Sequence, residues 1–195
     1  MTNILVSSFD AFGGLGANPS DVLRLELAER DASLKTVCLP TSYACAWAVL
    51  RDSLERHHPS HCLMFGYAQS TTVSLRLERS ATNADRAPSA DNDGSVLSGQ
   101  IVSSGPKTLH TGVDVDALAT QLRAQGHQVA VSDDAGGFVC NHLYYQSLEI
   151  GRREFPACTF LFVHVGGLPV AAGTIAAANE LLRLTRIDQQ GVRED

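Results

Sequence analysis

A strand is expected to lead into a helix within the stretch Gln128-Val-Ala-Val-Ser-Asp-Asp-Ala-Gly-Gly-Phe-Val-Cys-Asn-His-Leu-Tyr-Tyr145. Its first five residues carry the apolar, β-branched pattern of a short strand that ends at Ser132. Two glycines, Gly136 and Gly137, then lead into a segment expected to be helical over residues 141–153. A strand that turns directly into a helix is the repeating unit of α/β proteins.

The same alternation continues along the chain and predicts its fold class. Strands are expected at residues 4–7, 36–39, 62–68, 73–81, 128–132 and 159–165. Helices are expected at residues 20–30, 45–56, 116–125, 141–153 and 173–183, with Asn18 or Ser20 capping the first and Asp114 introducing the third. We therefore expect a single-domain, three-layer α/β/α sandwich with a mostly parallel mixed sheet.

The domain organisation is expected to be simple. Residues 1–188 fit one domain, and residues 189–195 look like a solvated tail. Residues 82–106 are rich in Ser, Asn, Asp, Gly and Pro, so they are expected to form one long loop of functional importance.

Composition narrows the possible partners and location. The 195 residues are 44% hydrophobic and 18% charged, with a formal net charge of -6 and no basic cluster, which argues against nucleic-acid binding. The N-terminus, Met1-Thr-Asn-Ile-Leu-Val6, lacks the pattern of a signal peptide or membrane anchor. Five cysteines without a C-x-x-C pair favour a reducing, cytoplasmic setting and argue against disulfides or a cysteine-zinc site.

Cys140 is a candidate nucleophile because it lies where the helix is expected to begin. The unpaired amides and the positive end of the helix dipole there favour a thiolate, and the same amides can hold a developing oxyanion. A cysteine in such a place is also commonly a small buried residue, so spacing alone leaves both interpretations open.

A thiol nucleophile needs a base, and two histidines are candidates. His142 lies two positions after Cys140 on the expected helix and would point away from it. His164 follows the apolar run Thr159-Phe-Leu-Phe-Val163, so it would lie near the end of a central strand, where α/β proteins commonly bind ligands. It is the better candidate, although a strand-end histidine can also be purely structural.

The third group should be a residue that orients the imidazole. Glu78 lies in the alternating segment Val73-Ser-Leu-Arg-Leu-Glu-Arg-Ser80, where a carboxylate would ordinarily face solvent or pair with a neighbouring arginine. Spacing does not choose Glu78 over Glu149 or Asp85.

Several segments together resemble the pyroglutamyl peptidase I family, also called pyrrolidone-carboxylate peptidases. The resemblance spans nearly the whole chain, and its most specific part is Cys140-Asn-His142 at a helix start. The other matching segments are Ile4-Leu-Val-Ser-Ser-Phe-Asp-Ala-Phe-Gly-Gly14, Asn18-Pro-Ser20, Leu39-Pro-Thr41, Gly66-Tyr-Ala68, Leu77-Glu-Arg79 with Asn83, Asp91-Asn92 and Phe162-Val-His-Val165.

The resemblance implies an activity and a set of roles. It implies a cytoplasmic thiol protease that hydrolyses the N-terminal pyroglutamyl residue from peptides, with Cys140 as nucleophile, His164 as base and then acid, and Glu78 orienting His164. It implies that no metal or cofactor is needed and suggests a homotetramer, whereas the charge and the N-terminal pattern argue against nucleic-acid and membrane partners. The lactam ring would lie in an apolar pocket whose matching positions here are Phe9, Phe12, Thr41, Phe138 and Val139.

The chain departs from the family pattern at three places, one of which is Val165-Gly-Gly-Leu-Pro169 where members usually have Val-Pro and an aromatic residue. Gln69-Ser-Thr71 stands where members often have Gly-Gly-Arg, and Pro88 stands where bacterial members commonly have an arginine. Arg86 is then expected to take over the support of the oxyanion region. The departures also leave open an alternative, a homologue that binds pyroglutamyl-like groups with little or no catalysis.

Two other patterns indicate little. Gly13-Gly-Leu-Gly16 follows the first strand but lacks the spacing of a nucleotide-binding loop. His57, His58 and His61 are interrupted by Pro59, so we expect a solvated helix end there rather than a metal site.

Overall fold

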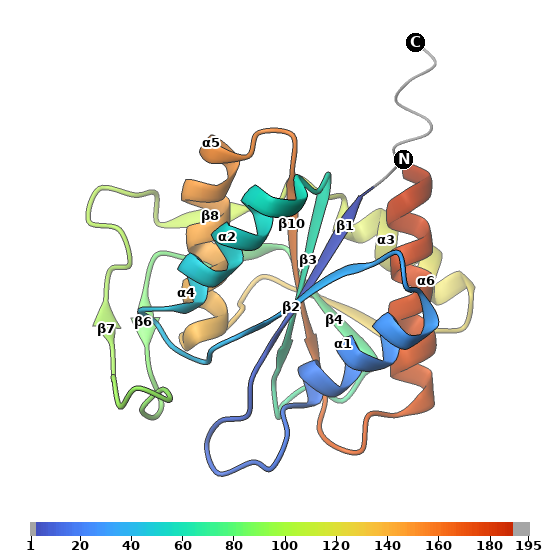
Figure 1. The fold of residues 1–195 in the computed structure, drawn as a ribbon, viewed down its shortest axis with the longest axis horizontal. Helices are drawn as coiled ribbons and strands as arrows, with labels where there is room; N and C mark the ends of the chain where they lie inside the picture. The colour runs from blue at the N-terminus through green and yellow to red at the C-terminus, as the bar shows by residue number, and fades with distance from the viewer. Residues whose placement is uncertain (1–2, 189–195) are drawn as a thin grey trace.

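A six-stranded mixed sheet forms the centre of the protein in a computed structural model that describes residues 3–188 (Figure 1). Its strand order is β2-β1-β3-β10-β4-β9, with β2, β1, β3 and β10 mutually parallel, β4 antiparallel to β10, and β9 parallel to β4. The strands are β1 (Ile4–Phe9), β2 (Lys35–Leu39), β3 (His61–Tyr67), β4 (Leu75–Glu78), β9 (Val129–Ser132) and β10 (Thr159–Val165).

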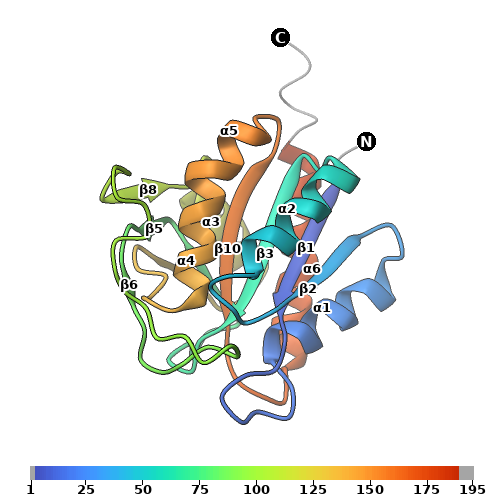
Figure 2. The same cartoon turned by 60° about the vertical axis from the view of Figure 1, so that its left-hand side comes forward.

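Helices cover both faces of this sheet, as the two views show (Figures 1 and 2). One apolar core lies between the sheet and α1, α3 and α6, and a second lies between the sheet and α2 and α4. The helices are α1 (Pro19–Arg30), α2 (Ala46–His57), α3 (Val115–Ala124), α4 (Val139–Gln146), α5 (Arg152–Glu154) and α6 (Ala172–Asp188). The expected α/β class with a mostly parallel mixed sheet is confirmed.

Local signals for helix starts are also confirmed. The Asn18 side chain caps α1 by accepting a hydrogen bond from the Ser20 amide at 3.0 Å. The Asp114 carboxylate caps α3 by accepting from the Ala117 amide at 2.9 Å. Each cap satisfies an amide that the helix leaves unpaired, which is why short polar residues mark these positions.

The strand expected over residues 73–81 is wrong in one respect, because it is two strands. After β4 the Arg79 amide donates to the Ser132 carbonyl at 2.7 Å, and the chain then leaves the main sheet. Its continuation, β5 (Ser80–Thr82), pairs with β8 (Thr108–His110) in a separate two-stranded sheet. Alternation of residue types continues across this bend, so the pattern alone did not reveal it.

The expected loop at residues 82–106 contains a second small sheet, β6 (Asp85–Arg86) paired with β7 (Ser98–Gly99). Asn83 anchors the far end of the loop because its side-chain oxygen accepts from the amides of Ile101 and Val102. Side-chain hydrogen bonds to the backbone thus replace regular structure over much of this segment.

The helix expected at residues 141–153 begins earlier, at Val139, and is not uniform. It continues from α4 through a π-helical turn, η1 (Ser147–Gly151), into the short α5. Gly136, just before it, has φ of +89°, a conformation that glycine adopts without steric cost.

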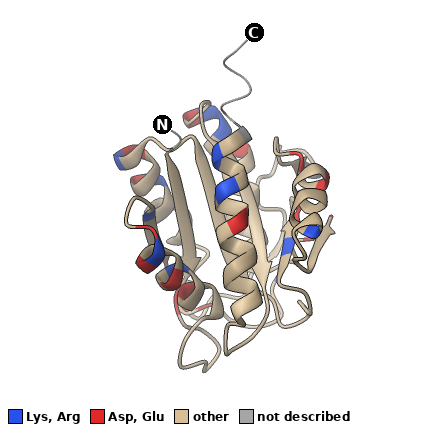
Figure 3. Cartoon of the chain, turned by 90° about the vertical axis from the view of Figure 1, so that its right-hand side faces the viewer, with Lys and Arg blue, Asp and Glu red and all other residues tan. Residues whose placement is uncertain are grey.

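The outer surface carries charges of both signs. Lys and Arg lie beside Asp and Glu along the helices of the side shown in Figure 3. Among the described residues, no helix is both long and apolar enough to cross a bilayer. The tail expected at residues 189–195 lies outside the part of the chain that the structure describes.

Candidate active site

A pocket of about 280 Å³ lies at the edge of the sheet where β1, β3 and β10 end. Its walls bring together residues that are far apart in the sequence. They include seven of the eight residues singled out from the sequence: Phe9, Phe12, Thr41, Phe138, Val139, Cys140 and His164. Glu78, the eighth, is fully buried just behind His164.

Cys140 occupies the first turn of α4. The helix begins at Val139, and its first hydrogen bond runs from the His142 amide to the Phe138 carbonyl at 3.1 Å. The amides of the preceding turn are therefore left to other acceptors. The Cys140 sulfur lies over Gly66, where an added Cβ would come within 2.9 Å of it.

The position of the sulfur relative to His164 follows from strand pairing. Gly66 on β3 is the register partner of His164 on the neighbouring strand β10. Paired strands lie about 4.8 Å apart, so the Cys140 sulfur lies above a backbone position adjacent to the histidine. The half-buried thiol and the buried imidazole line the same pocket.

The surroundings of Cys140 work against the thiolate that the helix start favours. Burial raises the pKa of its thiol to about 12, and the negative charge of Glu78 acts in the same direction. The hydrogen bond from its own backbone amide and the charge of Arg76 oppose this shift without reversing it. The helix start is therefore present, but loss of solvent outweighs it because a thiolate is costly to bury.

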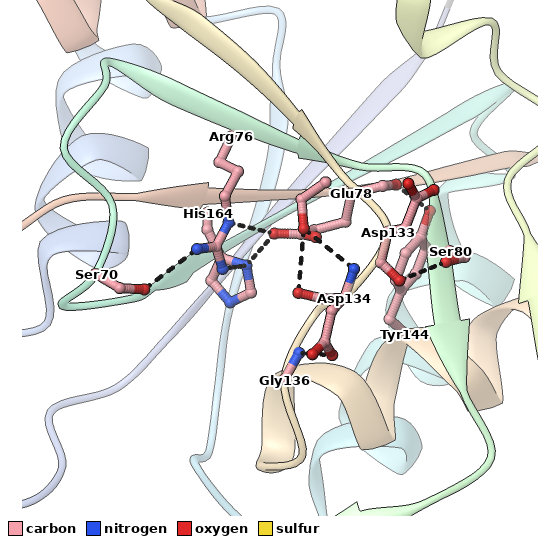
Figure 4. Close-up of polar contacts among 10 residues, drawn as sticks. Ser70, Arg76, Glu78, Ser80, Asp133, Asp134, Gly136, Tyr144 and His164 are labelled. Atoms are coloured by element: carbon pink, nitrogen blue, oxygen red, sulfur yellow. Dashed lines mark hydrogen bonds and ion pairs between the residues drawn. The ribbon is translucent and has the colours of Figure 1, made fainter.

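His164 is held by Glu78, as Figure 4 shows. Its Nδ1 lies 2.7 Å from the Glu78 Oε1, and both side chains are buried. The antiparallel pairing of β10 with β4 sets this contact, since Glu78 stands opposite Phe162 and Arg76 stands opposite His164 on the same face. The free Nε2 of His164 is then the ring nitrogen available to the pocket.

The structure separates Glu78 from the other two acids that the sequence left open. Asp85 lies 2.9 Å from Nδ1 of His142 instead, and Glu149 faces Arg153. His142 is thus committed to Asp85 and packs edge-on against Tyr43.

Asn141 and His142 have a structural explanation. The Asn141 side chain accepts from the Thr82 amide at 2.9 Å and donates to the Thr82 and Ala84 carbonyls. Together with the His142–Asp85 contact, these bonds tie the first turn of α4 to the start of the long loop. The two residues after the cysteine therefore fix the orientation of the helix that carries it.

The apolar end of the pocket is built from aromatic rings. The rings of Phe12 and Phe138 lie 5.7 Å apart, and Tyr43 meets Phe138 edge to face at the same distance. Thr41 is buried beside them, with its amide donating to the Asp10 carboxylate at 2.7 Å. Phe9 also packs on Phe162 in the core, so it serves both core and pocket.

Arg86 and Pro88 lie at the rim of the pocket. The Arg86 guanidinium donates to the Gly136 carbonyl at 3.3 Å. Arg86 also passes so close to Gly137 that an added Cβ there would lie 2.7 Å from the Arg86 Cβ and 3.0 Å from its backbone nitrogen. Arg86 thus braces the turn that precedes α4.

Sequence reasoning considered a neighbouring arginine only as an ordinary partner of Glu78, and the structure places Arg76 in the pocket itself. Its guanidinium lines the pocket and contacts both Glu78 and His164. The signal was available, because Arg76 and Glu78 are two apart on a strand and so share a face. Tyr67, Ala68 and Ser70 complete this side of the pocket.

A thiol, an imidazole and a buried carboxylate gathered at the strand ends of an α/β sheet are the groups of a cysteine-type hydrolase. Comparison with known proteins identifies the family. The family model for pyroglutamyl peptidases matches residues 2–181, so the chain belongs to the pyroglutamyl peptidase family.

Named relatives and solved structures agree with this assignment. A pyrrolidone-carboxylate peptidase of Bacillus velezensis is 34% identical over 170 residues, 85% of this chain and 79% of that protein. Pyroglutamyl peptidase I of Bacillus amyloliquefaciens superposes with a TM-score of 0.81 at 28% identity over 95% of both chains. Pyrrolidone carboxyl peptidase of Thermus thermophilus gives 0.79 at 32% identity over 93% of this chain and 98% of that one.

Proposed function

We propose that this protein is a cysteine peptidase that removes the N-terminal pyroglutamyl residue from peptides. The observation that carries the proposal is the 2.7 Å contact between His164 and buried Glu78 at a pocket that Cys140 also lines. Membership of the pyroglutamyl peptidase family supplies the substrate class.

The proposed mechanism begins with a thiol. As the Cys140 sulfur bonds to the carbonyl carbon that follows the lactam ring, its proton passes to Nε2 of His164, and an electron pair moves onto the carbonyl oxygen. Amides in the first turn of α4 stabilise that oxygen. Glu78 stabilises the imidazolium that has formed.

Collapse of this intermediate completes the first half of the reaction. The C–N bond breaks, the leaving amine takes the proton from His164, and a thioester remains on Cys140. His164 then accepts a proton from water as that water attacks the thioester. The C–S bond breaks, pyroglutamate is released, and the sulfur takes the proton back from His164 and is again a thiol.

The pocket suits a small, uncharged and cyclic group. Phe9, Phe12 and Phe138 offer apolar surface to the ring, with Thr41 and Val139 beside them. An ordinary peptide N-terminus carries an ammonium that would lose its water there, and this loss is costly without a partner. We infer that the pocket selects pyroglutamate partly by excluding charge.

We also infer a location and an assembly. Five free cysteines, at least two of them exposed, suit a reducing cytoplasm. The family resemblance suggests a homotetramer, and light scattering on the purified protein would give its mass. A monomeric mass would contradict the tetramer.

The test of the activity is hydrolysis of a fluorogenic amide of pyroglutamate. Wild type should release the fluorophore, whereas Cys140→Ser and His164→Ala should each lose about a thousandfold or more of kcat/KM and keep their fold. Cys45→Ser, at an exposed cysteine, is the matched control and should keep its activity.

The same assay separates catalysis from binding alone. Ser70, Thr71 and Pro88 motivated the alternative of a homologue that binds without hydrolysis. Absence of turnover by folded wild type, between about pH 6 and pH 9, would reject the peptidase and favour that alternative.

A further inference from the structure

The Arg76 guanidinium sits against the histidine and carboxylate of the site (Figure 4). Its Nε donates to the Glu78 Oε1 at 2.7 Å, and its Nη1 donates to the Ser70 hydroxyl at 3.2 Å. Its Nη2 lies 3.2 Å from Nδ1 of His164. Three partners on three sides hold this guanidinium in a fixed position.

The single negative charge of Glu78 is shared by two neighbouring groups, Arg76 and His164. Its Oε1 receives both the Arg76 Nε and the His164 Nδ1, each at 2.7 Å. Its Oε2 is buried and has no hydrogen-bond partner among the described residues. When Nδ1 donates its proton to Glu78, Arg76 cannot donate to the same nitrogen, so two donor groups lie side by side.

This arrangement suits a neutral imidazole better than an imidazolium. A protonated ring would place a second full positive charge 3.2 Å from the guanidinium, with one carboxylate oxygen in hydrogen-bond contact with both. Like charges at that separation repel strongly in a partly buried site. A neutral ring avoids this repulsion and keeps its hydrogen bond to Glu78.

The same guanidinium has only a small effect on the pKa of the Cys140 thiol. The pKa of the Cys140 thiol is raised by burial first and by the charge of Glu78 second, and the lowering effect of Arg76 is the smallest of its influences. The effect of Arg76 on the imidazole is direct instead, because its guanidinium lies 3.2 Å from the ring nitrogen.

We propose that Arg76 is a positioning residue that keeps His164 neutral, so that Cys140 and His164 rest as thiol and imidazole rather than as a thiolate–imidazolium pair. The inference rests on the proposed roles of these two residues. The proton stays on sulfur in the free protein and moves to His164 only when the sulfur bonds to the substrate carbonyl.

The charges that face the imidazole come from several elements. Besides Arg76 and Glu78 on β4, the titratable or charged groups around this pocket are Cys140 on α4, Tyr67 on β3 and Arg86 on β6. Arg76 and Glu78 are the ones in hydrogen-bond contact with the ring, which makes Arg76 the cation to remove.

Alkylation of Cys140 by iodoacetamide tests the proposal, because this uncharged reagent reacts with thiolate. The rate is followed from about pH 5 to pH 10 by mass spectrometry of the peptide that contains Cys140. Arg76→Met removes the cation, so the thiolate–imidazolium pair should form and alkylation near pH 6 should speed up about tenfold or more. Arg76→Lys keeps the charge and should resemble wild type.

Three controls make the result specific. Arg79→Met removes an arginine that pairs with Asp116 and Asp133 outside the site, and it should leave the profile unchanged. Arg76→Gln is a second neutral variant in case the methionine variant does not fold. Adding His164→Ala to Arg76→Met should abolish the gain, because the ion pair needs the imidazole.

An Arg76→Met or Arg76→Gln protein that is folded by circular dichroism and alkylates with the wild-type profile would overturn the proposal. A gain that persists without His164 would also overturn it. No peptide substrate enters the measurement, so either outcome would leave the proposed peptidase activity standing, and loss of that activity would leave this test intact.

Discussion

Gly66→Ala should damage both stability and activity. Gly66 lies on β3 beneath the site, and an ideal Cβ there would come within 2.7 and 2.8 Å of two ring carbons of Phe162 and 2.9 Å of the Cys140 sulfur. Ordinary contact begins near 3.4 Å, so the ring would have to move by about 0.7 Å and the sulfur by about 0.5 Å.

The size of the effect follows from two opposing terms. Overpacking of a filled core costs about 1–3 kcal/mol, whereas alanine is better than glycine in a strand by roughly 0.5–1 kcal/mol. We expect a net loss of about 1–2 kcal/mol in the free energy of unfolding. Displacement of the nucleophile by half an ångström should lower kcat/KM by roughly tenfold to a hundredfold.

Urea unfolding and the fluorogenic assay measure the two effects separately. Gly112→Ala is the matched control, because its added Cβ meets no atom within 4 Å, and it should be neutral. Replacing Phe162 by Leu in the Gly66→Ala background removes part of the ring, so a double-mutant cycle should show a favourable coupling above about 0.5 kcal/mol. Wild-type stability together with wild-type turnover in Gly66→Ala would refute this reasoning.

Two further predictions concern alkaline stability and the rim arginine. Burial raises the pKa of the Cys158 thiol from 9.0 to about 12, so its protonated form stabilises the fold fully below about pH 9 and this contribution is lost as pH rises towards 12. Above pH 9 the free energy of unfolding should therefore fall less steeply in Cys158→Ala than in wild type, by about 1.4 kcal/mol per pH unit. Urea unfolding at pH 8 and pH 10 measures both proteins, and the same drop in each would contradict this prediction. Arg86→Ala removes the exposed hydrogen bond to Gly136, so the free energy of unfolding should fall by about 1 kcal/mol or less. Because the turn before α4 loses this support, kcat/KM should fall about tenfold. Unchanged turnover would show that Arg86 does not support the turn before α4 in catalysis.

The sequence identified the fold class well because its signals are local. Runs of apolar residues with period two or 3.6, and caps such as Asn18 and Asp114, report the conformation of a few neighbours. They fail where a strand changes its pairing partner while the alternation of residue types continues, as happens between β4 and β5 at Arg79. Alternation continues through the bend, but the strand that receives each hydrogen bond is chosen by residues far away.

The sequence by itself also determined where a nucleophile and a base could lie, since Cys140 precedes a helix and His164 ends a strand. Spacing left three acids open as the partner of the histidine, and the family resemblance favoured Glu78. The tertiary structure gives the physical reason, because Glu78 contacts His164 through the antiparallel register of β4 with β10. The presence of Arg76 in the same network depends on that register too. Burial likewise depends on neighbours from every part of the chain, and it raises the pKa of the Cys140 thiol against the local effect of a helix start.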